Sequence, residues 1–168
     1  MKYKHTITQN IRIGSVNIEN TPKGLYLTLN SGVNGAWLSE DMDYIGSFAY
    51  RLPDLMKVKP KKVLVAGLGL GLISCYLEKE YPDSEVTAVE IRQDVVDAMK
   101  LVDKLKTSTI INQSIWDYKP NETYDLVIMD IWFNCNDKMP PCSEIEQRIE
   151  HLVSPGGKVY VPLRDRVY

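Results

Sequence analysis

Three glycines in alternate positions form the segment best suited to binding a ligand. They are Gly67, Gly69 and Gly71, and they follow the apolar run at residues 63–66. Glycine lets the backbone turn sharply and approach a ligand closely, because no Cβ stands in the way. Glu90 comes 19 residues after Gly71, where a carboxylate can accept hydrogen bonds from both ribose hydroxyls of an adenosine. The pattern predicts an adenosine-binding loop; the alternative is a tight strand-to-helix turn with an unrelated surface glutamate.

The spacing of these glycines distinguishes between adenosine-containing ligands. Dinucleotide-binding enzymes prefer G-x-G-x-x-G, in which the third glycine lets helix and strand pack closely. Here the spacing is G-x-G-x-G, and Leu72 stands where a dinucleotide enzyme would carry its third glycine. The spacing therefore favours an adenosine ligand other than a dinucleotide.

Several further segments occur in an order that is found in one enzyme family. An acidic segment with a tyrosine precedes a leucine-proline pair, and the later segments contain an acid or a Pro-Gly-Gly turn. They are residues 37–44, residues 51–53, residues 88–91, residues 124–130 and residues 154–157. With these segments the sequence resembles the class I S-adenosylmethionine-dependent methyltransferases, and within that superfamily it looks most like the spermidine synthase group. The resemblance covers roughly residues 24–163.

The resemblance implies a cofactor and a role for individual residues. The cofactor would be S-adenosylmethionine or its decarboxylated form. Asp130, at the end of the fourth strand of the parallel sheet, would face the substrate. The residues that would contact the cofactor are Gly67, Leu68, Gly69, Gly71, Glu90, Ile91, Ser114 and Ile115.

The sequence also departs from the synthase pattern. Leu70 stands where the synthases carry an acid that helps to hold the amine of decarboxylated S-adenosylmethionine. Ser114 is the nearest match to their aspartate that contacts the adenine amine, and residues 131–134 replace their aspartate-proline pair. The sequence stops after the fifth strand, where the superfamily normally adds two more. Leu70 favours methyl transfer, whereas the acidic segment at residues 37–44 favours aminopropyl transfer.

Asp130 and its neighbours are the candidates for the transfer chemistry. The group carried by a sulfonium is already activated for displacement. The protein therefore mostly has to bring the attacking group and the sulfonium together in the right orientation. Asp130 can accept the proton of an attacking amine or hold that amine, unless it only caps a helix or anchors a loop. Trp132 and Phe133 could line the acceptor pocket or cover a cation, with core packing as the alternative. Asp43 and Tyr44 could close the pocket, although an aspartate there also suits the first turn of a helix.

From Pro60 onward, short apolar runs alternate with helical patterns. Strands are expected at residues 63–66, 86–89, 109–111, 125–131 and 158–163, and helices at residues 70–81, 93–105 and 143–153. Near-continuous apolar strands that alternate with helices predict a parallel sheet covered on both faces. The expected fold is therefore α/β, a Rossmann-like doubly wound parallel sheet.

Before Pro60 the pattern predicts a small antiparallel sheet beside the parallel one, which we call the annex. Short runs that alternate apolar and polar residues are expected to form strands, and they lie at residues 11–18, 25–29 and 36–38. Residues 39–56 have a helical pattern with Ser39 as a plausible N-cap. We expect residues 1–58 to form the β-hairpin annex with its helix, and residues 59–168 to form the Rossmann-like S-adenosylmethionine-binding core.

The composition of the chain argues against several classes of function. The chain has 168 residues, a net charge of −2 and 44% hydrophobic residues, values typical of one globular domain without the basic stripe of a nucleic-acid-binding protein. No run approaches the roughly 18 apolar residues that span a bilayer, and the first ten residues lack the apolar core of a signal peptide. Three cysteines in a chain of this size suggest a reducing compartment, so a cytoplasmic location is expected. Cys135 and Cys142 do not have a zinc-site spacing, and no metal is expected.

Three functions stay open at this point. The first is a methyltransferase for a small molecule, and the second is an aminopropyltransferase of the spermidine synthase type. The third is a binding or regulatory module that keeps the cofactor fold without turnover. For a transferase the partner is expected to be a small-molecule acceptor, for which an amine is one candidate. A homodimer is expected as well, built from the annex or from the edge of the fifth strand at residues 159–161.

Overall fold

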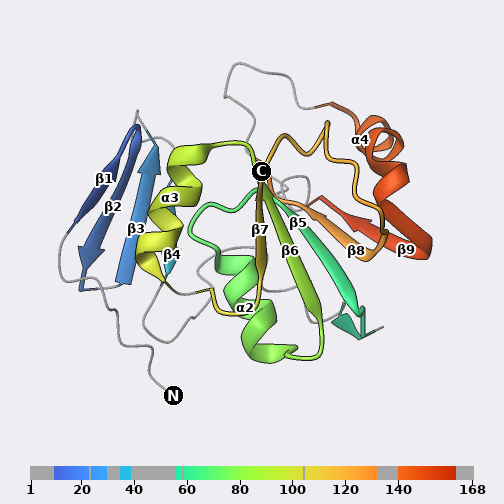
Figure 1. The fold of residues 1–168 in the computed structure, drawn as a ribbon, viewed down its shortest axis with the longest axis horizontal. Coiled ribbons are helices and arrows are strands. Elements are labelled where there is room, and N and C mark those ends of the chain that lie inside the picture. Colours follow the sequence, from blue (N-terminus) through green and yellow to red (C-terminus); the bar gives the residue numbers. More distant parts are fainter. Residues whose placement is uncertain are drawn as a thin grey trace.

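The computed structural model contains two β-sheets that share a hydrophobic core (Figure 1). It describes residues 10–22, 24–29, 35–38, 56–57, 59–103, 105–131 and 140–161. Within these residues, one sheet has four antiparallel strands in the order β1-β2-β3-β4. The other has five parallel strands in the order β7-β6-β5-β8-β9. The α/β class, with a Rossmann-like parallel sheet and an antiparallel annex, is therefore confirmed.

The annex is a meander of short strands. They are β1 (Ile11–Ile13), β2 (Val16–Thr21), β3 (Gly24–Leu29) and β4 (Gly35–Leu38). The expectation of one continuous run over residues 11–18 is wrong, because the chain reverses at Gly14 and Ser15 and the run forms a hairpin. The period of two places the apolar side chains of β2 and β3 on one fully buried face, formed by Val16, Ile18, Leu25 and Leu27.

The parallel sheet follows the apolar runs of the sequence. Its strands are β5 (Lys62–Ala66), β6 (Glu85–Glu90), β7 (Thr109–Asn112), β8 (Tyr124–Met129) and β9 (Val153–Tyr160). The chain passes from β5 outward through β6 to β7, and then returns to the other side of β5 for β8 and β9. The strand order therefore reverses at β5. In sheets of this kind, ligands bind outside the carboxyl ends of the strands at the point of reversal.

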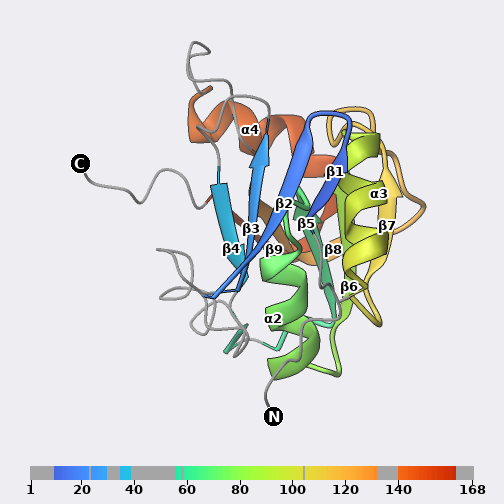
Figure 2. The same ribbon diagram turned by 90° about the vertical axis from the view of Figure 1, so that its left-hand side faces the viewer.

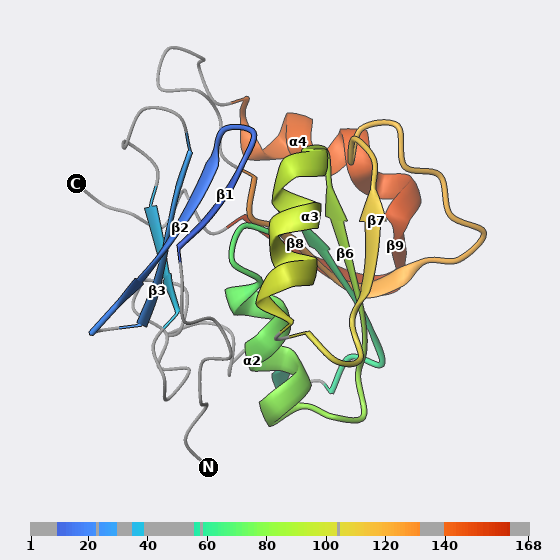
Figure 3. The same cartoon turned by 60° about the vertical axis from the view of Figure 1, so that its left-hand side comes forward.

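Helices cover both faces of the parallel sheet. They are α2 (Leu72–Glu80), α3 (Gln93–Val102), and α4 (Cys142–Ile149), which continues as a 3-10 turn, η1 (Glu150–Leu152). Figures 1 and 3 show α2 and α3 between the annex and the sheet, with α4 on the opposite face, and Figure 2 looks from the annex side. Alternate residues of β5 serve the two sides: Val63 and Val65 join the cluster of the annex, α2 and α3, whereas Leu64 and Ala66 join the cluster that includes Ile145 of α4. The apolar face of the annex is thus buried within the chain.

Helix boundaries differ from the expected ones where the backbone turns left-handed. The first helix begins at Leu72 and not at residue 70, because Gly71 precedes it with φ 68°. The second ends at Val102 and not at residue 105, since Asp103 has φ 49° and donates its N–H to the Met99 carbonyl at 3.1 Å. Such a residue directly after the last turn is a common helix terminus.

The last strand also differs from the expectation. It was expected over residues 158–163 after a turn at 154–157, but β9 begins at Val153 and contains that turn. Tyr124 pairs with Val153 and Leu126 with Lys158, so the intervening residues form a bulge within the strand. Residues 39–55 and 162–168, which include most of the expected N-terminal helix, lie outside the described residues.

The described helices are short. The longest of them, α3, has 10 residues. Within the described part of the chain, no helix is long and apolar enough to cross a membrane. Cys75, in α2, is buried, whereas Cys135 lies outside the described residues.

Candidate cofactor-binding site

The carboxyl ends of four parallel strands bring predicted site residues to one edge of the sheet. Gly67 follows β5, Glu90 ends β6, Ser114 comes soon after β7, and Asp130 follows β8. In Figure 1 the carboxyl ends of β5, β6 and β7 lie near the centre of the view. Because β6 and β8 flank β5, this edge is also the point at which the strand order reverses.

Gly67 joins the ends of three neighbouring strands. Its N–H donates to the carbonyl of Val89 on β6 at 2.8 Å. On the other side, a Cβ added to Gly67 would lie only 2.1 Å from the backbone oxygen of Asp130. Its φ of 94° is also one that side-chain-bearing residues rarely adopt. Glycine is therefore required here so that β5 can end between β6 and β8.

The other two glycines of the loop have different surroundings. A Cβ at Gly71 would contact Met99 and Leu105 at 3.1–3.3 Å, so this glycine allows α2 to begin close against α3 and the segment after it. A Cβ at Gly69 would meet nothing within 4 Å. Gly69 is therefore the position of the loop where a ligand can approach the backbone.

Glu90 braces the loop from the end of β6. Glu90 is 8% exposed, and its carboxylate accepts two backbone hydrogen bonds. Oε2 accepts the N–H of Leu68 at 2.9 Å, and Oε1 accepts the N–H of Arg92 at 2.9 Å. The predicted ribose acceptor is thus held between the glycine loop and the start of α3.

The end of β7 is tied to Glu90 as well. The carbonyl of Glu90 accepts Nδ2 of Asn112 at 2.8 Å and the N–H of Gln113 at 3.1 Å. This brings the half-buried Ser114 to the same edge, where its Oγ accepts the N–H of Trp116 at 3.3 Å. The side chain of Ile115 is buried in the core cluster under α4, so a ligand would meet this residue through its backbone.

The apolar side chains of the site differ in their exposure to solvent. Ile91 is 67% exposed, so it offers an apolar surface directly after Glu90. Leu68 and Leu70 are buried, at 5% and 1% exposure, in the cluster that joins the annex, α2 and α3. The position where the synthases carry an acid is therefore a core position in this chain.

Asp130 lies on the β8 side of Gly67. It is half-buried and meets the glycine loop through its backbone carbonyl. The strand before it is buried at every position except Asp125, which fixes the place of its main chain at the edge of the sheet. The predicted substrate residues Asp43, Tyr44, Trp132 and Phe133 lie outside the described residues.

Sequence reasoning missed a polar cluster next to Glu90, formed by Ser15, Arg92 and Asp94. Arg92 donates from Nε to Oδ1 of Asp94 at 3.1 Å and from Nη2 to Oδ2 at 2.9 Å. Ser15 donates to Oδ2 from its hydroxyl at 2.8 Å and from its N–H at 3.2 Å, and Arg92 also donates to the Ser15 hydroxyl. The signal in the sequence, an acid in the first turn of a helix, is too common to single out Asp94.

These contacts change the titration of Asp94. Burial by itself raises the pKa of the carboxyl group, but the hydrogen bonds from Arg92 and Ser15 outweigh it. The net result lowers the pKa of Asp94 to about 2 from its ordinary 3.8. Asp94 is therefore a charged anchor for Arg92 at any pH near neutrality.

Known proteins match this chain in structure and not in sequence. No protein-family model and no curated protein matches it. It is similar to human methyltransferase-like protein 13 in complex with SAH (S-adenosylhomocysteine), with a TM-score of 0.52 and 21% identity, over 64% of this chain and 56% of that one. It is similar to the plantazolicin methyltransferase in complex with SAH, with a TM-score of 0.51 and 18% identity, over 67% of this chain and 42% of that one. It is also similar to coclaurine N-methyltransferase bound to N-methylheliamine and SAH, with a TM-score of 0.51 and 17% identity, over 80% of this chain and 36% of that one.

Identities of 17–21% make these matches evidence of fold. This chain has a methyltransferase-like fold. It spans 36–56% of the length of the three proteins, so their whole activities do not carry over with the fold. All three are methyltransferases by name, and the resemblance to spermidine synthases is supported by the sequence motifs alone.

Proposed function

We propose that this chain binds S-adenosylmethionine and transfers its methyl group to a small molecule. The observation that carries the proposal is the geometry of Glu90, a buried carboxylate held at the reversal point of the sheet beside the open backbone of Gly69. The three named proteins of similar fold support it, because each of their structures contains SAH.

The residues present fit an adenosine cofactor. An ionised carboxylate has about four acceptor positions, and Glu90 uses two of them for the N–H groups of Leu68 and Arg92. The remaining positions suit the ribose hydroxyls. The exposed side chain of Ile91 offers apolar surface to the adenine, and the absence of a Cβ at Gly69 lets the cofactor approach the loop.

This arrangement gives the glycine loop, Glu90 and Asp130 separate roles in the proposed reaction. A bound sulfonium supplies a methyl group that is already activated for displacement. The glycine loop and Glu90 hold the nucleoside part, so that the transferable group has a fixed position. Asp130, on the other side of Gly67, holds an attacking amine by a charge-assisted hydrogen bond or accepts its proton.

The burial of Leu70 favours methyl transfer over aminopropyl transfer. Its side chain packs in the core, so it does not supply the acid that would hold the amine of decarboxylated S-adenosylmethionine. Aminopropyl transfer remains the second candidate, supported by the resemblance at residues 37–44 and 51–53. Binding without turnover is the third, supported by the unusual residues 131–134 after Asp130.

Calorimetric titration followed by a product assay separates these functions. We expect S-adenosylmethionine and SAH to bind, decarboxylated S-adenosylmethionine to bind more weakly, and NAD not to bind. Incubation with S-adenosylmethionine and a panel of small amines that includes polyamines should then give a methylated product by mass spectrometry. Binding of NAD without binding of either sulfur nucleoside would overturn the proposal. Tighter binding of the decarboxylated form together with an aminopropylated product would establish the second candidate.

Assembly and location are proposals as well. The annex buries its apolar face inside the chain, so we propose that a homodimer forms through β9, an edge strand of the described sheet whose Val159 is half-buried. Light scattering at micromolar concentration should give about twice the chain mass of 19.2 kDa, and a persistent monomer mass would refute the dimer. A cytoplasmic location is proposed from the three cysteines of the sequence, a number typical of a reducing compartment in a chain of this size.

A further inference from the structure

A continuous path of hydrogen bonds leads from the proposed ribose acceptor to the annex. Oε1 of Glu90 accepts the N–H of Arg92 at 2.9 Å, and the guanidinium of Arg92 binds both carboxylate oxygens of Asp94. Asp94 in turn accepts two hydrogen bonds from Ser15, in the turn of the β1–β2 hairpin. Residues 79 positions apart in the sequence therefore meet next to the site.

The connection between β6 and α3 is short, so fixing one residue of it fixes the others. It consists of Ile91 and Arg92, between the last residue of β6 and the first of α3. Arg92 is the N-cap residue of α3, with extended dihedral angles and no side-chain cap of its own. Its position is instead set by the bidentate contact with Asp94, a geometry that guanidinium and carboxylate groups favour.

The hairpin turn is seated closely on Asp94. A Cβ added to Gly14 would lie 2.9 Å from Oδ2 and 3.2 Å from Cβ of Asp94. Gly14 also has φ 55°, as a tight hairpin turn requires. In Figure 3, α3 lies directly beside the hairpin of β1 and β2. The annex therefore contacts α3 through its turn as well as through its apolar face.

We propose that Asp94 is a positioning residue for the cofactor site: it docks the annex hairpin on Arg92 and so holds the Glu90 carboxylate where it accepts the ribose hydroxyls. This inference rests on the proposed function, because it concerns the same cofactor. It extends that function by making the annex a part of the nucleoside site. Linkage then requires the bound nucleoside to stabilise the hairpin contact to the same degree.

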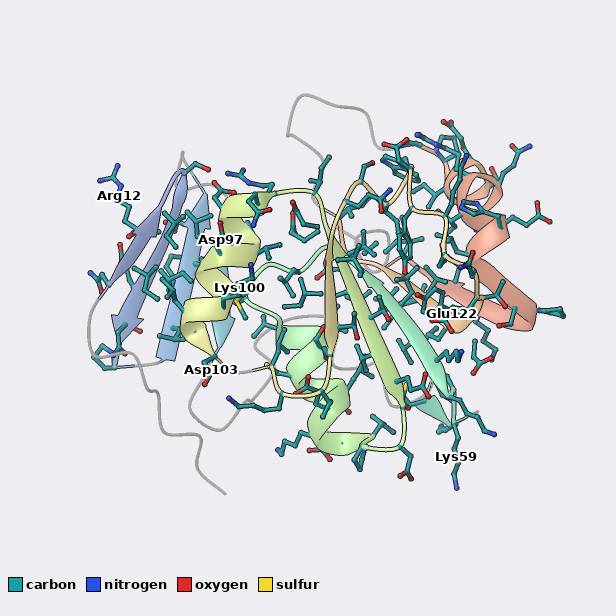
Figure 4. All side chains as sticks on the ribbon, in the orientation of Figure 1. Arg12, Lys59, Asp97, Lys100, Asp103 and Glu122 are labelled. Carbon is teal, nitrogen blue, oxygen red and sulfur yellow. The ribbon has the colours of Figure 1, made fainter. Side chains whose placement is uncertain are left out.

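The test compares Asp94→Asn with a matched carboxylate on the same helix, Asp97→Asn. Asp97 binds Gln93 at 2.8 Å and Lys100 at 3.3 Å, and has no hydrogen bond to Ser15 or Arg92; Figure 4 labels Asp97 and Lys100 on α3. The probes are SAH and its 2′-deoxy analogue, titrated by calorimetry into the whole chain. Asp94→Asn should weaken SAH binding about 5- to 10-fold, within the range of couplings between sites. Binding of the 2′-deoxy analogue should change much less, and Asp97→Asn should alter neither.

A second pair of variants approaches the cluster from the annex. Gly14→Ala pushes the hairpin away from Asp94, whereas Gly156→Ala has a comparable backbone cost, φ 80°, with nothing within 4 Å of the new Cβ. Gly14→Ala should weaken SAH binding in the same ribose-dependent way, and Gly156→Ala should not. This pair decides the matter if Asp94→Asn fails to fold.

The outcomes separate this inference from the proposed function. If the unaltered chain binds neither S-adenosylmethionine nor SAH, the proposed function itself fails. If it binds SAH better than the 2′-deoxy analogue, and the Asp94 and Gly14 variants retain that preference, Asp94 has no positioning role. An equal loss of affinity for both probes assigns the cluster to folding alone and likewise overturns the inference.

Discussion

The two sides of Gly67 hold their residues in different ways. On the β6 side, side chains build the site: the carboxylate of Glu90 binds the backbone of Leu68 and Arg92. On the β8 side, the main chain does so, because Asp130 meets Gly67 through its backbone carbonyl. Glu90 ends β6 and Asp130 follows β8, and the carboxylate of Glu90 holds the backbone of the glycine loop at Leu68.

Under the proposed function, we expect the β6 side to serve cofactor binding and the β8 side to serve turnover. A carboxylate that braces its own loop is pre-positioned, so it suits a cofactor part that never changes during the reaction. A carboxylate on the opposite strand, placed by its main chain, can serve an acceptor whose charge changes during transfer. Substitutions on the β6 side should therefore alter cofactor affinity, and substitutions on the β8 side should alter the rate.

The largest effect is expected for Asp130→Asn, which tests the β8 side. Loss of a group that accepts or holds a proton should lower the transfer rate about 100- to 10,000-fold. Affinity for S-adenosylmethionine should stay within a few-fold, as measured by calorimetry beside steady-state kinetics. A parallel loss of folding stability in denaturant would instead assign Asp130 a structural role.

Gly67→Ala tests the junction between the two sides. The added Cβ would stand 2.1 Å from a backbone oxygen, which no rotamer change relieves. We expect the free energy of unfolding to fall by about 4 kcal/mol, in the range of severe single substitutions. Gly69→Ala is the matched control, since it has φ 50° but open space around the new Cβ, and it should cost about 1 kcal/mol. Equal losses in urea unfolding would contradict the close contact with Asp130.

Glu90→Ala tests the β6 side. Removing a charged acceptor should cost about 1.5–3 kcal/mol of cofactor binding, or roughly 10- to 150-fold in Kd. The rate at saturating cofactor should change far less, which distinguishes Glu90 from Asp130. The exposed Glu85, at the amino end of β6, provides the control, and its replacement by alanine should leave Kd unchanged. A large fall in rate with unchanged Kd would reverse the assignment of the two sides.

The pH dependence of the free energy of unfolding tests how the β6 side is held to the annex. The expected change is the smallest of these predictions. The pKa of Asp94 is lowered in the folded chain to about 2 from 3.8, so its charged form stabilises the fold. That contribution is complete above about pH 4 and is lost as the pH falls through 2. Allowing for partial solvent screening, it amounts to about 1–2 kcal/mol. The difference in unfolding free energy between the unaltered chain and Asp94→Asn should therefore shrink between pH 4 and pH 2, and a constant difference would contradict the lowered pKa.

Contacts between residues close together in the chain were predictable. The alternation of apolar runs with helical patterns predicted the parallel sheet, because central strands such as β5 and β8 are buried on both faces and need a continuous apolar run. The same alternation of strand and helix patterns predicted that the loop at Gly67 to Gly71 and the acid at Glu90 lie at one edge of the sheet, since parallel strands end on the same side. Boundaries were less accurate: left-handed backbone at Gly71 precedes the start of α2, and left-handed backbone at Asp103 follows the end of α3, and apolar periodicity encodes neither.

The amino-acid sequence by itself determined the α/β class, the annex and the place of the glycine loop, because these depend on periodicity and on residues that are neighbours along the chain. Only the tertiary structure decided that Gly67 serves the junction with Asp130, that Leu70 belongs to the core, and that Ser15 docks on Asp94. The physical reason is the separation of the contacting residues along the sequence. A hydrogen bond between residues 79 positions apart leaves no periodic trace, and it forms only because burial of the annex against α2 and α3 brings the two partners together.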